Sequence, residues 1–393
     1  MKITELSTFR KIISEPPISA AFITILFFSL PVIISMFTRG YILLPGGYTY
    51  SLIVEPVYGI AAILLSLLLL YIFSMSPVVK LRFHSIITPD FGRKLLIIIY
   101  LLITWISFYN INVKLNFYNS LLNDPIPTML NVGSGLVEEK LLKSFFLGIS
   151  GCLGFALTNK NDSIVLRLSG LATMLAITLF YFFVGRREIS LMTLCFLLMV
   201  KRDKIGRVYL IITGSLLAAI LIFVLSIRIA PQNSNESLYA TDSEELSPIA
   251  YSSYVIQTAK PNILRSFTEA TPLRTHLYPT TIAAAFIKDQ TGYNDVATPV
   301  LGIAGITYMY GFVIPIAMLV MIGVLFRSIT NEYKIKKTAV IKLLLIYICF
   351  KSINLFRNGE FPIVIIDVVL FFILSLPALY LTFEKRQTLI EHG

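Results

Sequence analysis

Charged residues are scarce in this chain of 393 residues. Asp, Glu, Lys and Arg make up 14% of it, whereas an ordinary soluble protein carries about 25%. Hydrophobic residues make up 56%, and the mean hydropathy is +0.79. This composition excludes a soluble enzyme, a disordered chain and a disulfide-rich secreted domain.

Cysteine is scarce as well. Cys152, Cys195 and Cys349 lie inside apolar runs, with neither paired nor metal-ligand spacing, so no disulfide framework or zinc site is implied. The sequence also lacks a glycine-rich phosphate loop, a His-Glu-x-x-His motif, a GxSxG motif and a pair of CxxC motifs. We therefore expect no metal ion and no cofactor.

Long apolar runs are abundant. Crossing a hydrocarbon core about 30 Å thick takes about 20 apolar residues in a helix. Ten candidate runs lie between polar breaks, at 18–37, 52–76, 95–113, 141–158, 164–184, 189–200, 208–230, 300–326, 338–353 and 363–383. The sixth run is short, and is either a crossing with basic residues at both ends or a re-entrant segment. The sequence predicts an all-α fold, a single polytopic transmembrane domain over residues 1–393.

The net charge of +11 would suggest nucleic acid as a partner in a soluble protein. In a membrane protein, Lys and Arg instead gather in the loops that face the cytoplasm. With ten crossings, the bias per residue of loop places both termini in the cytoplasm. No nucleic-acid partner is expected.

The longest polar segment spans residues 231–299, between the predicted seventh and eighth crossings, and this topology places it outside. Its first part is acidic and polar, which favours mobility. Apolar residues return in helix-like spacing from Pro248 onward, for example at Ile249, Tyr251, Tyr254 and Val255. We expect short amphipathic helices that lie on the outer interface.

Arginines on the outer side run against the charge bias and need another cause. Two short turns contain them, at residues 185–188 (Gly-Arg-Arg-Glu) and 356–362 (Phe-Arg-Asn-Gly-Glu-Phe-Pro). Guanidinium matches phosphate oxygens with a fork of donors, and a lipid-linked phosphate would lie at this depth. The alternatives are anchoring to lipid headgroups, or neutralisation within the pairs Arg187–Glu188 and Arg357–Glu360.

The outer segment has further candidates in Arg265, Arg274, His276 and Tyr278. Such a mixture of charge, a titratable ring and an aromatic face is typical of sugar binding, and His276 could accept a proton near neutral pH. The alternative is a loop that packs on the membrane through its Tyr and Leu side chains.

Charges within the predicted crossings are costly unless they face a partner or a cavity. Arg167 and Lys342 lie near cytoplasmic ends and can reach the interface, and Glu55 lies near an outer end. Lys351 and Asp367 fall at comparable depth on consecutive crossings, so we predict a structural Lys351–Asp367 ion pair.

The layout resembles that of the bacterial O-antigen polymerases, the Wzy-type oligosaccharide repeat-unit polymerases. The shared features are ten or more crossings, a large outer loop in the second half and arginine-bearing outer turns. Three stretches support the resemblance, namely GRREISLMTL at 185–194, TPVLGIAGITYMYGFVIP at 298–315 and FRNGEFPIV at 356–364.

The resemblance implies a glycosyltransferase of the bacterial inner membrane whose active site faces the periplasm. It would transfer one polyprenyl-pyrophosphate-linked glycan onto the acceptor sugar of another. The implied catalytic residues are Arg186, Arg187 and Arg357 on the pyrophosphate, with His276, Glu188 or Glu360 as the base. Arg265, Arg274 and Tyr278 would bind a second phosphate or the glycan. A chain-length regulator and a flippase are the implied protein partners.

Three other functions share parts of this pattern. An O-antigen ligase has the same general layout and donor but transfers to the lipid A core. A flippase for lipid-linked oligosaccharides, or another transporter, usually shows inverted internal symmetry, which is not detectable here. A membrane scaffold without catalytic activity is the last alternative.

Overall fold

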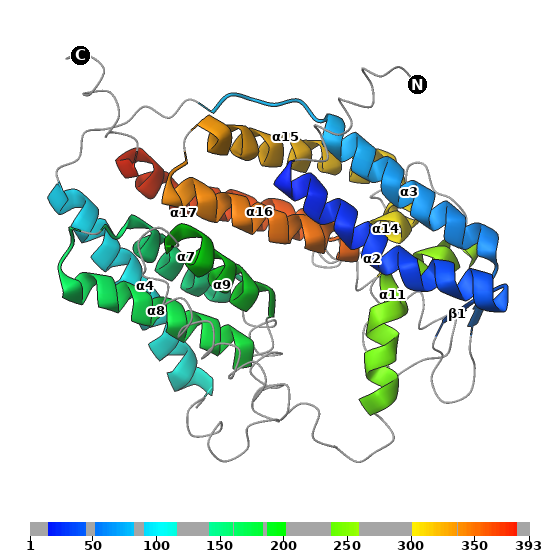
Figure 1. Ribbon diagram of the computed structural model, residues 1–393, viewed down its shortest axis with the longest axis horizontal. Helices are drawn as coiled ribbons and strands as arrows, with labels where there is room; N and C mark the ends of the chain where they lie inside the picture. The colour runs from blue at the N-terminus through cyan, green and yellow to red at the C-terminus, as the bar shows by residue number, and fades with distance from the viewer. Residues whose placement is uncertain are drawn as a thin grey trace, which may run out of the picture. The chain divides into compact units, whose positions relative to one another are not determined.

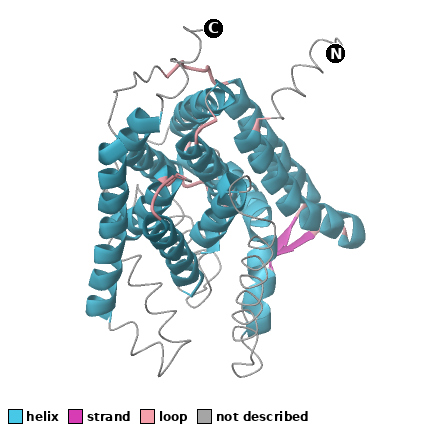
Figure 2. Ribbon diagram, turned by 60° about the vertical axis from the view of Figure 1, so that its left-hand side comes forward, coloured by secondary structure: helices cyan, strands magenta, loops and turns pink. Residues whose placement is uncertain are grey.

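The computed structural model describes residues 15–44, 52–81, 90–115, 141–159, 161–183, 187–201, 237–258, 301–335 and 337–382. All described elements are helices except one pair of short strands (Figure 2). In chain order they are α2 (Pro16–Arg39), β1 (Ile42–Leu44), β2 (Leu52–Val54), α3 (Pro56–Met75), α4 (Asp90–Leu115), α7 (Leu141–Leu157), α8 (Ile164–Phe183), α9 (Arg187–Lys201), α11 (Ser237–Thr258), α14 (Ile303–Tyr310), α15 (Val313–Ile335), α16 (Ala339–Asn358) and α17 (Phe361–Thr382).

Seven of the described helices are long and apolar enough to cross a membrane: α2, α3, α4, α8, α15, α16 and α17 (Figure 1). The described apolar part of α7, Gly148–Leu157, is shorter. The predicted helical, multi-pass membrane protein is confirmed at this level.

Two predicted span boundaries are wrong. The run 52–76 begins with strand β2, and its helix starts only at Pro56. The run 300–326 forms two helices, because the backbone at Gly311 has a φ of 90° that does not continue a helix. The first of them, α14, is about 12 Å long and cannot cross a bilayer. The run 208–230 lies outside the described residues.

The short sixth run is helical and forms α9, which has 15 residues. A helix of this length spans about 22 Å, less than the hydrocarbon core. The choice between a crossing and a re-entrant segment stays a prediction.

The chain divides into two compact units. Unit 1 consists of Met1–Lys80, Pro231–Asn331 and Ile348–Val368, and unit 2 of Leu81–Ala230, Glu332–Tyr347 and Val369–Gly393.

In unit 1, proline and glycine set the ends of the first helices. Pro16 and Pro56 occupy the first turns of α2 and α3, where a missing N–H costs nothing. Gly40 ends α2 in a left-handed conformation with a φ of 74°. The antiparallel strands β1 and β2 follow, with Ile42 paired to Val54. Both side chains are buried, so this pair closes one end of the α2–α3 packing.

Helix α11 belongs to the segment predicted to be a large outer loop. Its spacing of Ile249, Tyr251, Tyr254 and Val255 is helical, as predicted. Residues 248–255 are nevertheless buried on all sides, including Ser252 and Ser253. They pack against α2, α3 and α14, so the expectation of an amphipathic helix lying on the interface is wrong for this part.

The contact of α11 with α14 is made through small residues. The backbone N–H of Gly302 donates to the carbonyl of Pro248 at 3.1 Å, and that of Gly305 donates to Ser252 Oγ at 3.1 Å. A β-carbon on Gly305 would lie 3.0 Å from Ser252 Cα, so glycine permits this approach. The contact fixes α14 against a buried helix.

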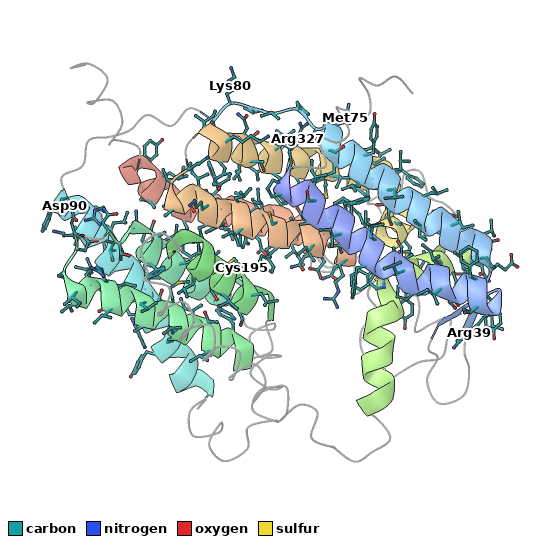
Figure 3. The ribbon with its side chains drawn as sticks, in the orientation of Figure 1. Arg39, Met75, Lys80, Asp90, Cys195 and Arg327 are labelled. Carbon is teal, nitrogen blue, oxygen red and sulfur yellow. The ribbon has the colours of Figure 1, made fainter. Side chains whose placement is uncertain are left out.

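In unit 2, α4, α7, α8 and α9 pack together. Gly154 of α7 lets α4 approach, since a β-carbon there would lie 3.2 Å from Leu101 Cδ2. Hydroxyl groups join α8 and α9, where the Oγ1 atoms of Thr178 and Thr193 are 2.8 Å apart in a buried position. Cys195 of α9, labelled in Figure 3, is free and partly buried.

Candidate functional site

The turn between α16 and α17 consists of Gly359 and Glu360. Gly359 has a φ of 69°, and its N–H donates to the carbonyl of Leu355 at 2.9 Å, which ends α16. The carbonyl of Glu360 accepts from the N–H of Val364 at 3.0 Å, so α17 starts at once. The tight turn fixes the backbone of the four residues from Arg357 to Glu360.

Helix α14 packs directly on this turn. A β-carbon on Gly359 would lie 2.6 Å from Cγ1 of Ile306. Glycine is therefore required at position 359 for two reasons: the backbone is left-handed, and Ile306 fills the space that a β-carbon would need. All of these residues belong to unit 1.

Arg357 is the last-turn cation of α16, a position where positive charge complements the helix dipole. Its Cζ atom lies 5.8 Å from the ring centroid of Phe28 in α2, within cation–π range. Its Nε atom is buried and has no hydrogen-bond partner among the described residues. Within the described part of the chain Arg357 forms no ion pair, so the neutralising pair with Glu360 that the sequence allowed is not formed.

Two more orphaned polar atoms belong to residues next to Ile306 and Gly359 in the sequence. Oδ1 of Asn358 is buried and finds no hydrogen-bond partner in the part of the chain that the structure describes, and the same holds for Oγ1 of Thr307, the residue after Ile306. Most buried polar atoms in native proteins are paired, and each exception asks for an explanation. Both residues adjoin the contact between Ile306 and Gly359.

Two turns of α16 before Arg357, Lys351 forms an ion pair with Asp367 of α17. The side chains are 16% and 7% exposed, so both charges are largely withdrawn from solvent. This confirms the structural pair predicted from the sequence. Asp367 is the acidic residue of α17, and its ion pair is with Lys351 and not with Arg357.

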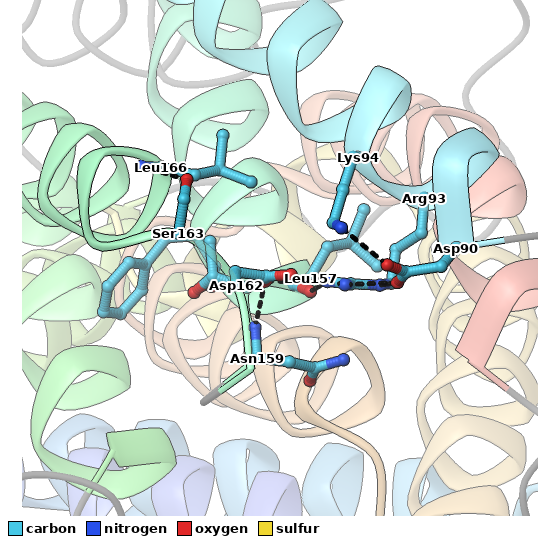
Figure 4. Close-up of polar contacts among 10 residues, drawn as sticks. Asp90, Arg93, Lys94, Leu157, Asn159, Asp162, Ser163 and Leu166 are labelled. Carbon is cyan, nitrogen blue, oxygen red and sulfur yellow. Dashed lines mark hydrogen bonds and ion pairs between the residues drawn. The ribbon is translucent and has the colours of Figure 1, made fainter.

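Two other arginines form ion pairs with acidic side chains. Sequence analysis counted both among the basic loop residues that set the orientation in the membrane. In unit 2, Arg93 Nη1 donates to Asp162 Oδ2 at 2.9 Å and to the carbonyl of Leu157 at 2.8 Å (Figure 4). Its Nε donates to Asp90 Oδ1 at 3.1 Å, and Asp90 also pairs with Lys94. The spacing of Asp90 and Arg93 was visible in the sequence, but the partner at Asp162 was not.

In unit 1, Arg327 of α15 joins three segments of the chain. Its Nε lies 3.2 Å from Glu15 Oε2, and its Nη1 donates to the carbonyl of Ser76, next to Met75 at the end of α3 (Figure 3). The adjacent Ser328 Oγ accepts from the N–H of Val79 at 2.9 Å. Arg93 and Arg327 thus join segments of the chain through ion pairs.

Asp162 lies in the short connection between α7 and α8. Arg93 donates to its carboxylate, and the backbone N–H of Asn159 donates to Oδ2 at 2.6 Å. These donors hold the pKa of Asp162 below its usual range, and Arg93 has the larger effect of the two.

Arg186, Arg265, Arg274, His276 and Tyr278 lie outside the described residues. Arg187 and Glu188 fall in the first turn of α9, but their side chains are not described. Of the predicted site residues, only Arg357 and Glu360 have described side chains, and both are partly buried at the α16–α17 turn.

No group of three or more His, Cys, Asp or Glu side chains that could hold a metal ion occurs among the described residues. Comparison of the chain with protein-family models, with curated proteins and with solved structures finds no match.

Proposed function

We propose that this chain is a membrane glycosyltransferase that polymerises polyprenyl-pyrophosphate-linked oligosaccharide repeat units into O-antigen or a related surface polysaccharide. The observation that carries the proposal is Arg357, a partly buried cation at a helix end that has no acidic partner in the described part of the chain. In contrast, Arg93 and Arg327, which join segments of the chain, each form an ion pair with an acidic side chain. An arginine left open beside an aromatic ring is suited to an anionic ligand.

The chemistry assigns a role to each group of the turn. The hydroxyl oxygen of the acceptor sugar attacks the anomeric carbon of the donor glycan, and the bond from that carbon to the pyrophosphate oxygen breaks. The electron pair leaves with polyprenyl pyrophosphate, whose growing negative charge Arg357 stabilises. The acceptor proton passes to a carboxylate, for which Glu360, three residues along the same turn, is the described candidate.

The proposed topology has ten crossings with both termini in the cytoplasm of a bacterial cell. The α16–α17 turn then faces the periplasm, together with the segment 231–299. Single-cysteine variants of the cysteine-free protein, labelled in intact cells with a membrane-impermeant maleimide, test this. Label should reach residue 360 and not residue 385, and the reverse result would overturn the assignment.

The functional test uses a strain that lacks the gene, complemented with Arg357→Gln, Arg357→Lys or Arg39→Gln. Arg39 is the matched control, because it is also a last-turn arginine but is exposed. We expect Arg357→Gln to lower polymer formation by about 10²-fold or more, as for other lost donors to a developing anion. Arg357→Lys should retain part of the activity, because the charge remains without the fork, and Arg39→Gln should be unchanged.

Polysaccharide length on gels and immunoblots for the protein are the measurements. Normal chain lengths in Arg357→Gln cells would overturn the role of Arg357. Deletion cells that make full-length polymer on the lipid carrier but fail to cap lipid A would show a ligase instead. Deletion cells that retain unflipped repeat units on the cytoplasmic side would show a transporter.

A further inference from the structure

The end of helix α16 that carries Arg357 is held on both sides by its neighbours in unit 1. The ring of Phe356 packs edge-to-face with the ring of Phe73, with centroids 5.7 Å apart, and Gly359 lies against Ile306. These contacts fix the backbone, but they do not fix the long side chain of Arg357. That side chain forms no hydrogen bond and no ion pair with a described residue, so the direction of its guanidinium depends on another contact.

This contact is made by the ring of Phe28, which lies within the apolar helix α2. The Cζ atom of Arg357 is placed over the ring, 5.8 Å from its centroid, where the negative face of the ring attracts a cation. Phe27 supports the ring edge-to-face, with centroids 5.2 Å apart and an interplanar angle of 85°. Phe28 and Arg357 are both partly buried, so water screens the attraction less than it would at the surface.

A ring holds a cation in a way that an acidic side chain does not. It uses no N–H donor and adds no negative charge, so the guanidinium keeps its hydrogen bonds for another group. Arg93 shows the opposite arrangement, since its Nε donates to Asp90 and its Nη1 donates to Asp162. Of the guanidinium nitrogens of Arg357, only Nε is covered and unpartnered among the described residues. Nη1 and Nη2 are not covered in this way, and they are the atoms that can reach an anion.

We infer that Phe28 is a positioning residue for the proposed reaction. Its ring holds the guanidinium of Arg357 and leaves Nη1 and Nη2 free to donate to the departing pyrophosphate. The inference rests on the proposed function and extends it to a residue of α2 that acts only through Arg357. A side chain of similar size without an aromatic face would lose this effect, because the guanidinium would then adopt several directions.

The test compares Phe28→Leu, Phe28→Tyr and Phe37→Leu in the full chain, reconstituted in proteoliposomes with the lipid-linked repeat unit extracted from the gene-deletion strain. Phe37 is the matched control, because it belongs to the same helix and is 87% exposed. Phe28→Leu should lower kcat about tenfold, the size of one partly desolvated cation–π contact, with KM little changed, since the charge on the leaving group grows in the transition state. Phe28→Tyr keeps the ring face and should retain most of the activity, and Phe37→Leu should be unchanged.

Two further measurements separate positioning from packing. Phe28 is replaced by phenylalanine with one, two or three ring fluorines, which keep the shape but weaken the negative face of the ring step by step. The value of kcat should fall with each fluorine, while the thermal unfolding of the protein changes little. In the Arg357→Gln background, Phe28→Leu should cause no further loss, because both changes remove the same interaction.

The outcomes distinguish this inference from the proposed function. If kcat is the same for all three fluorinated proteins, or if Phe28→Leu lowers it equally with and without Arg357, Phe28 acts through packing and the inference is wrong while the proposed function stands. The same conclusion follows if Phe28→Leu has a normal kcat while Arg357→Gln is impaired. If the wild type forms no polymer from the extracted repeat unit, the proposed function fails and the inference falls with it.

Discussion

Ile306 occupies the space that a β-carbon on Gly359 would need, at 2.6 Å from its Cγ1 atom. Gly359→Ala is therefore expected to lower the free energy of unfolding by about 2–4 kcal/mol, through the left-handed backbone and the clash together. Gly40→Ala is the control, because Gly40 has a φ of 74° but no atom within 4 Å of its β-carbon position. It should cost only about 1–2 kcal/mol. Thermal unfolding in nanodiscs measures both, and equal losses would contradict the packing of α14 on the turn.

The two acids that hold Arg93 differ in exposure. The Asp162 side chain is 1% exposed and that of Asp90 is 62% exposed. Asp162→Asn is expected to cost about 2–4 kcal/mol of stability, because it leaves a partly buried guanidinium without its main counter-charge. Asp90→Asn should cost at most about 1 kcal/mol, as for exposed pairs. The prediction fails if thermal unfolding ranks the two variants the other way round.

Acid should remove the contribution of Asp162. Arg93 holds the pKa of Asp162 below its usual range, so the ionised carboxylate stabilises the folded state above the unfolded pKa of about 3.9. This stabilisation is lost as the pH falls through the lower folded pKa. The melting temperatures of the wild type and Asp162→Asn should differ at neutral pH and converge in acid. A difference that stays constant down to pH values of about 2 would rule out this linkage.

Arg327 should matter more than its partner Glu15. Arg327→Ala removes the donor to both Glu15 and the carbonyl of Ser76, and is expected to cost about 3 kcal/mol. Glu15→Gln keeps an acceptor oxygen and should cost about 1 kcal/mol. The double variant should lose less stability than the sum of the two single losses, since both changes remove the same interaction. Additive losses in thermal unfolding would show that the contact contributes nothing.

Removing an orphaned hydroxyl should cost nothing. Thr307→Val keeps the shape of a fully buried side chain and deletes a polar atom that has no partner in the described ranges. We expect unchanged or slightly raised stability, by up to about 1 kcal/mol, because a buried hydroxyl without a hydrogen bond is a net cost. Thr178→Val is the control, since it breaks the contact with Thr193 and should destabilise. A loss in Thr307→Val as large as in the control would mean that the hydroxyl has a partner.

Apolar run length predicted most of the described helices, because a membrane demands long stretches without charge. The pair Lys351–Asp367 was also predictable, since a two-residue turn places the two side chains at similar depth. Gly311 was missed, as hydropathy is continuous across it and only the backbone conformation breaks the helix.

Counting basic residues by loop could not separate structural arginines from those that have no acidic partner among the described residues. Arg93 and Arg327 contributed to the orientation bias like any other cation, while their partners Asp162 and Glu15 lie 69 and 312 residues away. At the candidate site, sequence analysis singled out Arg357 and Glu360 because they lie in a turn that it predicts to face outward. Asn358 was not singled out, because its side-chain oxygen is seen to be buried, and unpaired among the described residues, only in the structure.

Helix α11 restricts how the segment 231–299 can be handled in experiments. Residues 248–255 are enclosed by α2, α3 and α14, and Ser252 Oγ accepts a hydrogen bond from the N–H of Gly305 inside that packing. A recombinant fragment cut out for antibody production would expose this apolar surface to water and should aggregate. Conversely, removing the segment from the full chain would take out an interior helix and leave unit 1 without part of its core.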